Sequence, residues 1–94
     1  MTLLTNNEVE MKKYLSKIEV QILEILKVFG ELSAKDIAVL SGNSSVEITV
    51  ECIYMYSACL IGRTHPDRPK EILYSITEIG EETLTLSKII MIQL

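Results

Sequence analysis

Three serines, each followed three positions later by an acidic residue, mark the starts of helices in the first half of the chain. In a capping box the serine hydroxyl accepts a backbone N–H of the first turn, and the acidic side chain accepts the N–H of the serine. Each pair stands just before an apolar segment, so the pattern predicts three short helices joined by tight turns. The pairs are Ser16–Glu19, Ser33–Asp36 and Ser44–Glu47, the second being a weaker form because Asp is shorter than Glu.

Glycines and apolar periodicity give the extents of the first two helices. The first is expected from Lys17 to Phe29, with Gly30 as its stop. The second covers "AKDIAVLSG" and is stopped at Gly42. A weaker helix is expected before them, at about residues 7–15. The residues expected on the buried sides are Ile18, Ile22, Leu23, Leu26 and Phe29 in the first helix, and Ile37, Ala38 and Leu40 in the second.

The third helix is expected to run from Ser44 to about Leu60, near Gly62, and a different pattern follows it. Two prolines flank the turn in "RTHPDRPKEILYSI", and alternating residues after it suit a strand, so a β hairpin is predicted between Arg63 and Ile76. Thr77 then caps a last helix over roughly residues 78–93.

Two segments resemble parts of a winged helix-turn-helix domain. "AKDIAVLSGNSSVEI" is similar to the helix-turn-helix step, and "ILYSITEIG" resembles the end of the wing in MarR-type and PadR-type transcriptional regulators. The resemblance implies a mainly α fold with a small β hairpin and flanking helices. The resemblance covers roughly Ser16 to Leu84. The length of 94 residues fits one domain, which we divide into an N-terminal segment (1–15), core and wing (16–76) and a C-terminal dimerisation helix (77–94). One departure is Cys59-Leu60-Ile61, where those regulators have Gly-Leu-Ile.

The third helix is apolar over most of its circumference. At 100° per residue, one stripe is expected to pack on the first two helices. A second stripe lies nearly opposite and either packs against the wing or the N-terminal segment, the interpretation we favour, or forms an exposed protein-binding surface. The remaining arc is acidic, through Glu47 and Glu51. The first stripe holds Ile48, Cys52, Met55 and Cys59, and the second holds Val46, Val50, Ile53 and Ser57.

Positive charge concentrates in the expected wing, whose cations can contact phosphates or enter a minor groove. Neutral donors stand at the start of the third helix, where backbone amides can also meet a phosphate. For the wing, the alternative explanation is a turn-rich loop with ordinary solvated surface charges. The candidate DNA-binding residues are Asn43, Ser44, Ser45, Thr49, Arg63, His65, Arg68 and Lys70.

Composition limits the other classes of function. The net charge of −4 argues against a basic surface over the whole domain. Cys52 and Cys59 are about 10 Å apart along a helix, too far for a disulfide, and are expected to be buried thiols. His65 is the only histidine, so neither a metal site, a cofactor nor a catalytic constellation is expected. The absence of a signal segment and of a long apolar run predicts a cytoplasmic protein without a membrane span.

The C-terminal helix is expected to pair two copies of the chain. Seven of the eleven residues in "LTLSKIIMIQL" are large and apolar, more than one small core can cover. The N-terminal segment could cover part of this surface instead. The candidate interface residues are Leu84, Leu86, Ile89, Ile90 and Leu94.

Two functions remain open at this level. The first is a small DNA-binding transcriptional regulator, acting as a homodimer on double-stranded DNA. The second is an acidic adaptor or antirepressor on the same fold, which binds a basic protein through Glu47 and Glu51 and does not bind DNA. An enzyme is not expected.

Overall fold

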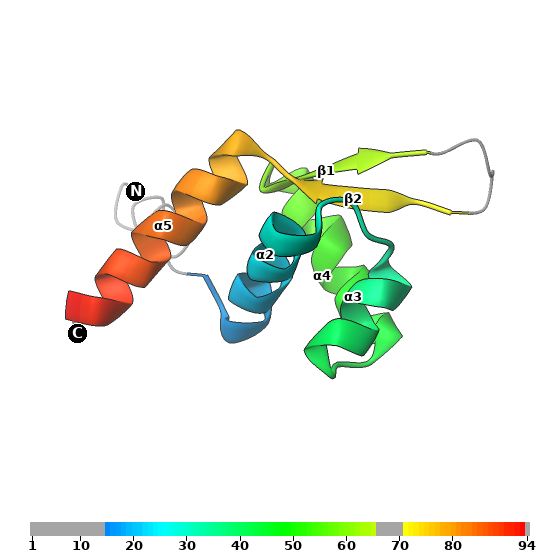
Figure 1. Cartoon of the computed structure of the whole chain (residues 1–94), viewed down its shortest axis with the longest axis horizontal. Helices are drawn as coiled ribbons and strands as arrows, with labels where there is room; N and C mark the ends of the chain where they lie inside the picture. Colours follow the sequence, from blue (N-terminus) through cyan, green and yellow to red (C-terminus); the bar gives the residue numbers. More distant parts are fainter. Residues whose placement is uncertain (1–14, 66–70, 94) are drawn as a thin grey trace, which may run out of the picture.

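The computed structural model describes residues 15–65 and 71–93, and it confirms the predicted order of elements. Three helices are followed by an antiparallel hairpin and a last helix (Figure 1). The helix predicted at residues 7–15 lies almost wholly outside the described residues. The elements are α2 (Lys17–Phe29), α3 (Ala34–Ser41), α4 (Ser45–Ser57), β1 (Ile61–Thr64), β2 (Leu73–Ile76) and α5 (Glu78–Gln93).

The helix starts follow from their serine caps. At α2 both halves of the capping box form: Ser16 Oγ accepts from the Glu19 amide at 3.3 Å, and Glu19 Oε1 accepts from the Ser16 amide at 2.8 Å. At α4 only one half is present, from the Glu47 amide to Ser44 Oγ at 3.1 Å. The prediction of a complete box there was therefore wrong in its second half.

Helix α4 ends at Ser57, three residues earlier than predicted, because the chain turns into the left-handed region at Cys59 (φ 64°). The Leu60 amide donates to the Met55 carbonyl and the Cys59 amide to the Tyr56 carbonyl, both at 3.0 Å. These two bonds form a Schellman motif, and the buried Leu60 and Met55 supply the apolar residues that usually accompany it. Cys59 thus occupies the position where glycine is most common.

The hairpin forms the wing. Ile61 pairs with Ile76 and Thr64 with Leu73, while Leu32, in the loop between α2 and α3, exchanges two backbone hydrogen bonds with Tyr74. This extra bridge attaches the base of the hairpin to the helical part. In Figure 1 the hairpin and α5 extend from opposite ends of the body formed by α2, α3 and α4. The predicted hairpin is confirmed, although Ile72 precedes its second strand.

A tight junction joins α4, β1 and α5. Thr77 Oγ1 donates to the carbonyl oxygens of Cys59 (2.7 Å) and Leu60 (2.9 Å), and it accepts from the Gly80 amide at 2.9 Å. Thr77 therefore caps α5 as predicted. A side chain at position 80 would overlap the Leu60 carbonyl, so the helix can approach this closely only because the residue is glycine.

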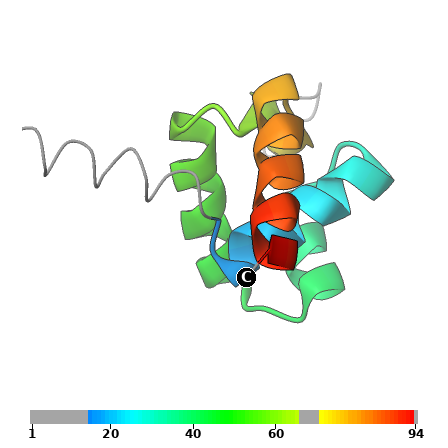
Figure 2. The same ribbon diagram turned by 90° about the vertical axis from the view of Figure 1, so that its left-hand side faces the viewer.

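The core lies between the helices and the base of the hairpin. The buried apolar residues are Ile22, Leu23, Leu26, Ile37, Ala38, Ile48, Cys52, Met55, Leu60, Ile61, Tyr74 and Leu84. Helix α5 packs on α2, and Figure 2 looks along the molecule with α5 nearest the viewer. None of the helices within the described residues is long and apolar enough to cross a membrane.

Several residues expected to be buried are exposed. Phe29 is the last residue of α2 and is 57% exposed, and Leu40, near the end of α3, is 48% exposed. The thiol of Cys59 is exposed because the chain has already left the helix there. The second stripe of α4, for which burial was favoured, faces outward from the described part of the chain.

Replacing Cys59 by glycine should stabilise the protein. The left-handed conformation costs a non-glycine residue about 1–2 kcal/mol, and glycine removes this strain. Glycine also loses more conformational entropy on folding, which offsets about 0.5–1 kcal/mol of the gain. We expect Cys59→Gly to raise the free energy of unfolding by roughly 0.5–1 kcal/mol, measured by urea denaturation under reducing conditions.

Gly42 supplies the matched control. Gly42 also lies in the left-handed region (φ 74°), and a Cβ placed there would contact no other atom. Gly42→Ala therefore changes only the backbone strain and should lower the free energy of unfolding. A Cys59→Gly variant less stable than the parent would contradict the assignment of strain to Cys59.

Candidate nucleic-acid interface

The four candidates at the start of α4 lie together, but three of their side chains already have partners. Asn43 Nδ2 donates to Gln21 Oε1 at 3.3 Å, Ser44 Oγ caps the helix, and Thr49 Oγ1 donates to the Ser45 carbonyl at 2.7 Å. Ser45, in the first turn, is exposed. These three side chains therefore stabilise the start of α4 by intramolecular hydrogen bonds. The groups left to bind a ligand are the backbone amides of the first turn and the hydroxyl of Ser45.

The wing carries its cations toward α4. Arg63, on β1, stacks over the ring of Tyr56, with the guanidinium carbon 4.3 Å from the ring centroid. Both residues are exposed, as is His65, which directly follows β1. This cation–π contact holds the arginine beside the helix. Arg68 and Lys70, the other two wing candidates, lie outside the described residues.

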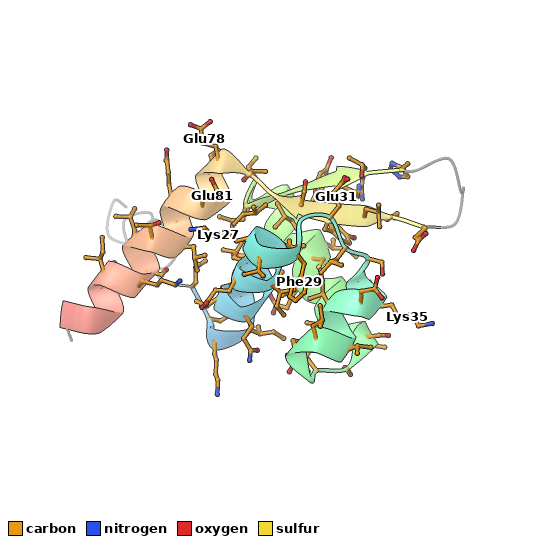
Figure 3. All side chains as sticks on the ribbon, in the orientation of Figure 1. Lys27, Phe29, Glu31, Lys35, Glu78 and Glu81 are labelled. Atoms are coloured by element: carbon orange, nitrogen blue, oxygen red, sulfur yellow. The ribbon has the colours of Figure 1, made fainter. Side chains whose placement is uncertain are left out.

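A hollow of about 320 Å³ separates the start of α3 from the wing. Lys35 contributes a cation to its rim, Glu71 a carboxylate, and Thr49 the wall formed by α4. Figure 3 shows Lys35 at the start of α3, pointing away from the body of the molecule, so its charge is available to a ligand. The sequence prediction missed Lys35 and Tyr56, because their positions beside the wing depend on the tertiary path of the chain.

The acidic groups of α4 lie on its other flank, toward the start of α2. Burial raises the pKa of Glu51, and the negative charges of Glu19 and then Glu47 raise it further. The proximity of Glu19 places this acidic cluster (Glu19, Glu47 and Glu51) beside α2. On a helical projection Thr49 and Tyr56 fall on the opposite side. The two carboxylates of α4 itself therefore lie on the flank away from Arg63, while Glu71 is the acidic residue beside Lys35 on the wing side.

The thiols differ in their surroundings. Cys52 is fully buried, and burial, together with the neighbouring charge of Glu51, raises its pKa to about 12. It therefore stays a neutral thiol at physiological pH. Cys59 is exposed, which corrects the expectation of two buried thiols.

The candidate pairing surface on α5 is smaller than predicted. Leu84 is 1% exposed and belongs to the core of the single chain, so it is not available to a second copy. Leu86 and Ile89 are 55% and 46% exposed, and Ile90 is partly buried. Leu94 lies outside the described residues. An ion pair, Lys88 Nζ to Glu24 Oε2 at 3.6 Å, links α5 to α2 beside this surface.

Comparison with known proteins identifies the fold. No protein-family model and no curated protein matches the chain. Among solved structures, YusO from Bacillus subtilis superposes with a TM-score of 0.73 at 26% identity, over 93% of this chain and 64% of that one. Wild-type MarR from E. coli superposes with a TM-score of 0.71 at 9% identity, over 78% and 55% of the two chains.

A third structure is the transcriptional repressor CouR bound to a 23-mer DNA duplex. It matches with a TM-score of 0.74 at 19% identity, over 81% of this chain and 54% of that one. The chain thus spans less than two thirds of the length of these three proteins. It has a MarR-like winged helix-turn-helix fold.

Neutralising Glu51 should stabilise the protein at neutral pH. Because its pKa is raised in the folded state, the folded protein favours the protonated carboxyl, and the penalty for ionising it grows as the pH rises above the ordinary value of 4.5. Glu51→Gln should therefore raise the urea midpoint at pH 7 and lose this advantage below about pH 4.5. Glu71→Gln, at an exposed position away from the cluster, is the control. An equal gain at both pH values would contradict this origin.

Proposed function

We propose that this chain is a DNA-binding transcriptional regulator that contacts double-stranded DNA through α4 and the wing. The observation that carries the proposal is the position of Arg63, held over Tyr56 so that a wing cation lies beside the outward side of α4. Two surfaces that a duplex can engage together are thereby brought side by side, a helix for a major groove and a cationic hairpin for the adjoining backbone.

The charge distribution supports this assignment despite the net charge of −4. Lys35 and Arg63 lie toward the wing side of α4, together with the carboxylate of Glu71, whereas Glu51 is close to Glu19 on the other side. Arg68 and Lys70 add two cations to the wing sequence. A phosphate backbone running along the wing side would thus meet cations and stay clear of the acidic cluster. The fold is also that of CouR, which was solved on a DNA duplex.

We further propose that two copies pair through α5, so that residues 1–94 act as one domain with a core and wing and a C-terminal dimerisation helix. Leu86 and Ile89, exposed on one side of α5, are the residues we assign to this contact, with Ile90 at its margin. Leu94 is part of the same proposal from the sequence. Two-fold pairing is the commonest closed arrangement for identical chains and would present two wings to one duplex.

A second candidate function is a protein-binding adaptor or antirepressor. The acidic cluster favours it: Glu47 and Glu51 share one flank of α4 with Glu19 near by, and a basic partner would relieve their mutual repulsion. Such a protein would not bind duplex DNA even at low salt, and a pull-down would recover a basic protein.

The dependence of duplex binding on salt tests the first function. Each phosphate contact contributes about −0.9 to the slope of log K against log salt, so replacing Arg63, Arg68 and Lys70 together by alanine should reduce the slope by up to about 3. Fluorescence anisotropy with a duplex selected from a random-sequence pool measures it. Lys27→Ala, on α2 and away from the wing, should leave the slope unchanged. Absence of duplex binding at low salt would exclude the proposal.

Pairing through α5 predicts a change in mass on substitution. Ile89→Lys combined with Ile90→Lys places two charges in the contact, so the dimer should convert to monomer and bind duplex more weakly. Sedimentation equilibrium at tens of micromolar protein measures the mass. Val39→Lys, at a 75% exposed residue on α3, is the control and should leave the dimer intact. A monomeric mass for the parent chain would contradict the pairing.

A further inference from the structure

The outward side of α4 is formed by Val46, Val50 and Ile53, which we call the apolar face of α4. These residues are 75%, 60% and 54% exposed. On the helix they lie opposite the buried Ile48, Cys52 and Met55, so packing of the described part of the chain does not account for them. Three branched aliphatic side chains in one strip are exposed within the described part of the chain, so a ligand that covers them gains the free energy of apolar burial.

The residues that border the apolar face are favourable for binding a nucleic acid on the wing side and unfavourable on the side of α2. Toward the wing it continues into Thr49 and into Tyr56, on which Arg63 is stacked. Toward α2 it borders Glu47 and Glu51. A duplex whose backbone follows the wing would therefore bring a major groove over the apolar face while its phosphates meet the cations.

The chemistry of the apolar face selects among base edges. In the major groove, guanine presents two acceptors, adenine a donor and an acceptor, cytosine a donor, and thymine an acceptor and a C5 methyl group. Valine and isoleucine can neither donate nor accept a hydrogen bond. The thymine methyl is thus the one major-groove group of standard DNA that these side chains can contact favourably.

The residues beside the face add little competing specificity. Bidentate recognition of guanine needs Arg or Lys, and that of adenine needs Asn or Gln. None of these four residue types occurs in the α4 sequence SVEITVECIYMYS. The hydroxyl proton of Thr49 is donated to the Ser45 carbonyl of the same helix. Glu47 and the exposed Ser45 can hydrogen-bond base edges, Glu47 with cytosine N4, whereas the three aliphatic residues distinguish bases only by apolar contact.

We propose that the apolar face of α4 reads thymine methyl groups in the major groove, so that the preferred duplex carries thymines within each half-site. The inference rests on the proposed DNA-binding function and adds to it the chemical group that is recognised. It also assigns a role in specificity to Val46, Val50 and Ile53, whereas the wing supplies contacts that do not depend on sequence.

The test replaces thymine by deoxyuridine, which removes only the C5 methyl. A duplex is first selected from a random-sequence pool with the intact chain at low salt, and each half-site thymine is then replaced in turn. From the free energy of burying one methyl group, each contacted thymine should change the dissociation constant by about fourfold. Fluorescence anisotropy measures both duplexes under the same salt conditions.

Val50→Ala completes a double-substitution cycle. Val50→Ala should weaken binding to the thymine duplex. In this variant, replacing the contacted thymine by deoxyuridine should change the affinity much less than in the parent chain, because either substitution removes the same valine–methyl contact. Alanine is a good helix former, so α4 should keep its structure. The matched control is Val28→Ala, a valine on α2 that is 76% exposed and should leave both affinities unchanged.

The outcomes separate the inference from the function on which it rests. Equal affinity for thymine and deoxyuridine duplexes, with normal salt-dependent binding, would overturn thymine recognition and leave the regulator function standing. A Val50→Ala variant that weakens both duplexes equally would do the same. If the parent chain binds no duplex, both thymine recognition and the regulator function are overturned. If the parent chain instead captures a basic protein that Val50→Ala does not capture, the apolar face belongs to the adaptor function.

Discussion

The carbonyl of Leu60 is the point on which the arrangement of the wing and α5 depends. It accepts hydrogen bonds from the Thr77 amide at 3.3 Å and the Thr77 hydroxyl at 2.9 Å, and Gly80 packs directly against it. Since Leu60 immediately precedes β1 and Thr77 follows β2, this one acceptor closes the base of the hairpin and starts α5. The direction of α5, and with it any surface that α5 presents to a second copy, is thereby coupled to the position of the wing.

Features that depend on neighbouring residues were predictable from the sequence, and features that depend on tertiary partners were not. Serine caps and glycine stops act within a few residues, so the predicted bounds of α2 match the observed ones and those of α3 differ only at Gly42, which is its C-cap. The end of α4 was misplaced because the left-handed residue is Cys59, which carries no sequence signal for that conformation. Periodicity correctly placed Val46 and Val50 opposite the core, but it cannot say whether another element covers them. For the same reason it did not separate Leu84, which faces α2, from Leu86, which faces outward.

The distribution of charge would allow an acidic chain to bind DNA in the proposed way. The net charge of −4 describes the whole sequence, but the field that a ligand meets depends on which groups face it. Glu51 is close enough to Glu19 and Glu47 for their charges to raise its pKa, whereas Arg63 lies over Tyr56 on the wing side. A helix of mixed character thus has one flank that repels phosphates and one that tolerates them. This asymmetry would orient a duplex along the wing and disfavour its approach from the side of α2.

The proposed interface would give only weak binding for each copy, so the proposed pairing through α5 would be important to the function. Apolar contacts to methyl groups contribute modestly, and few cations are available for phosphates. When two copies are joined, binding of the first brings the second to its half-site at a high effective concentration, and the combined affinity can exceed that of one copy by orders of magnitude. Because the Leu60–Thr77–Gly80 junction couples α5 to the wing, the angle at which two α5 helices cross would also determine the separation of the two wings. Spacing between half-sites would then be a property of the junction and the dimer contact together, while the apolar face of α4 determines which bases are favoured within each half-site.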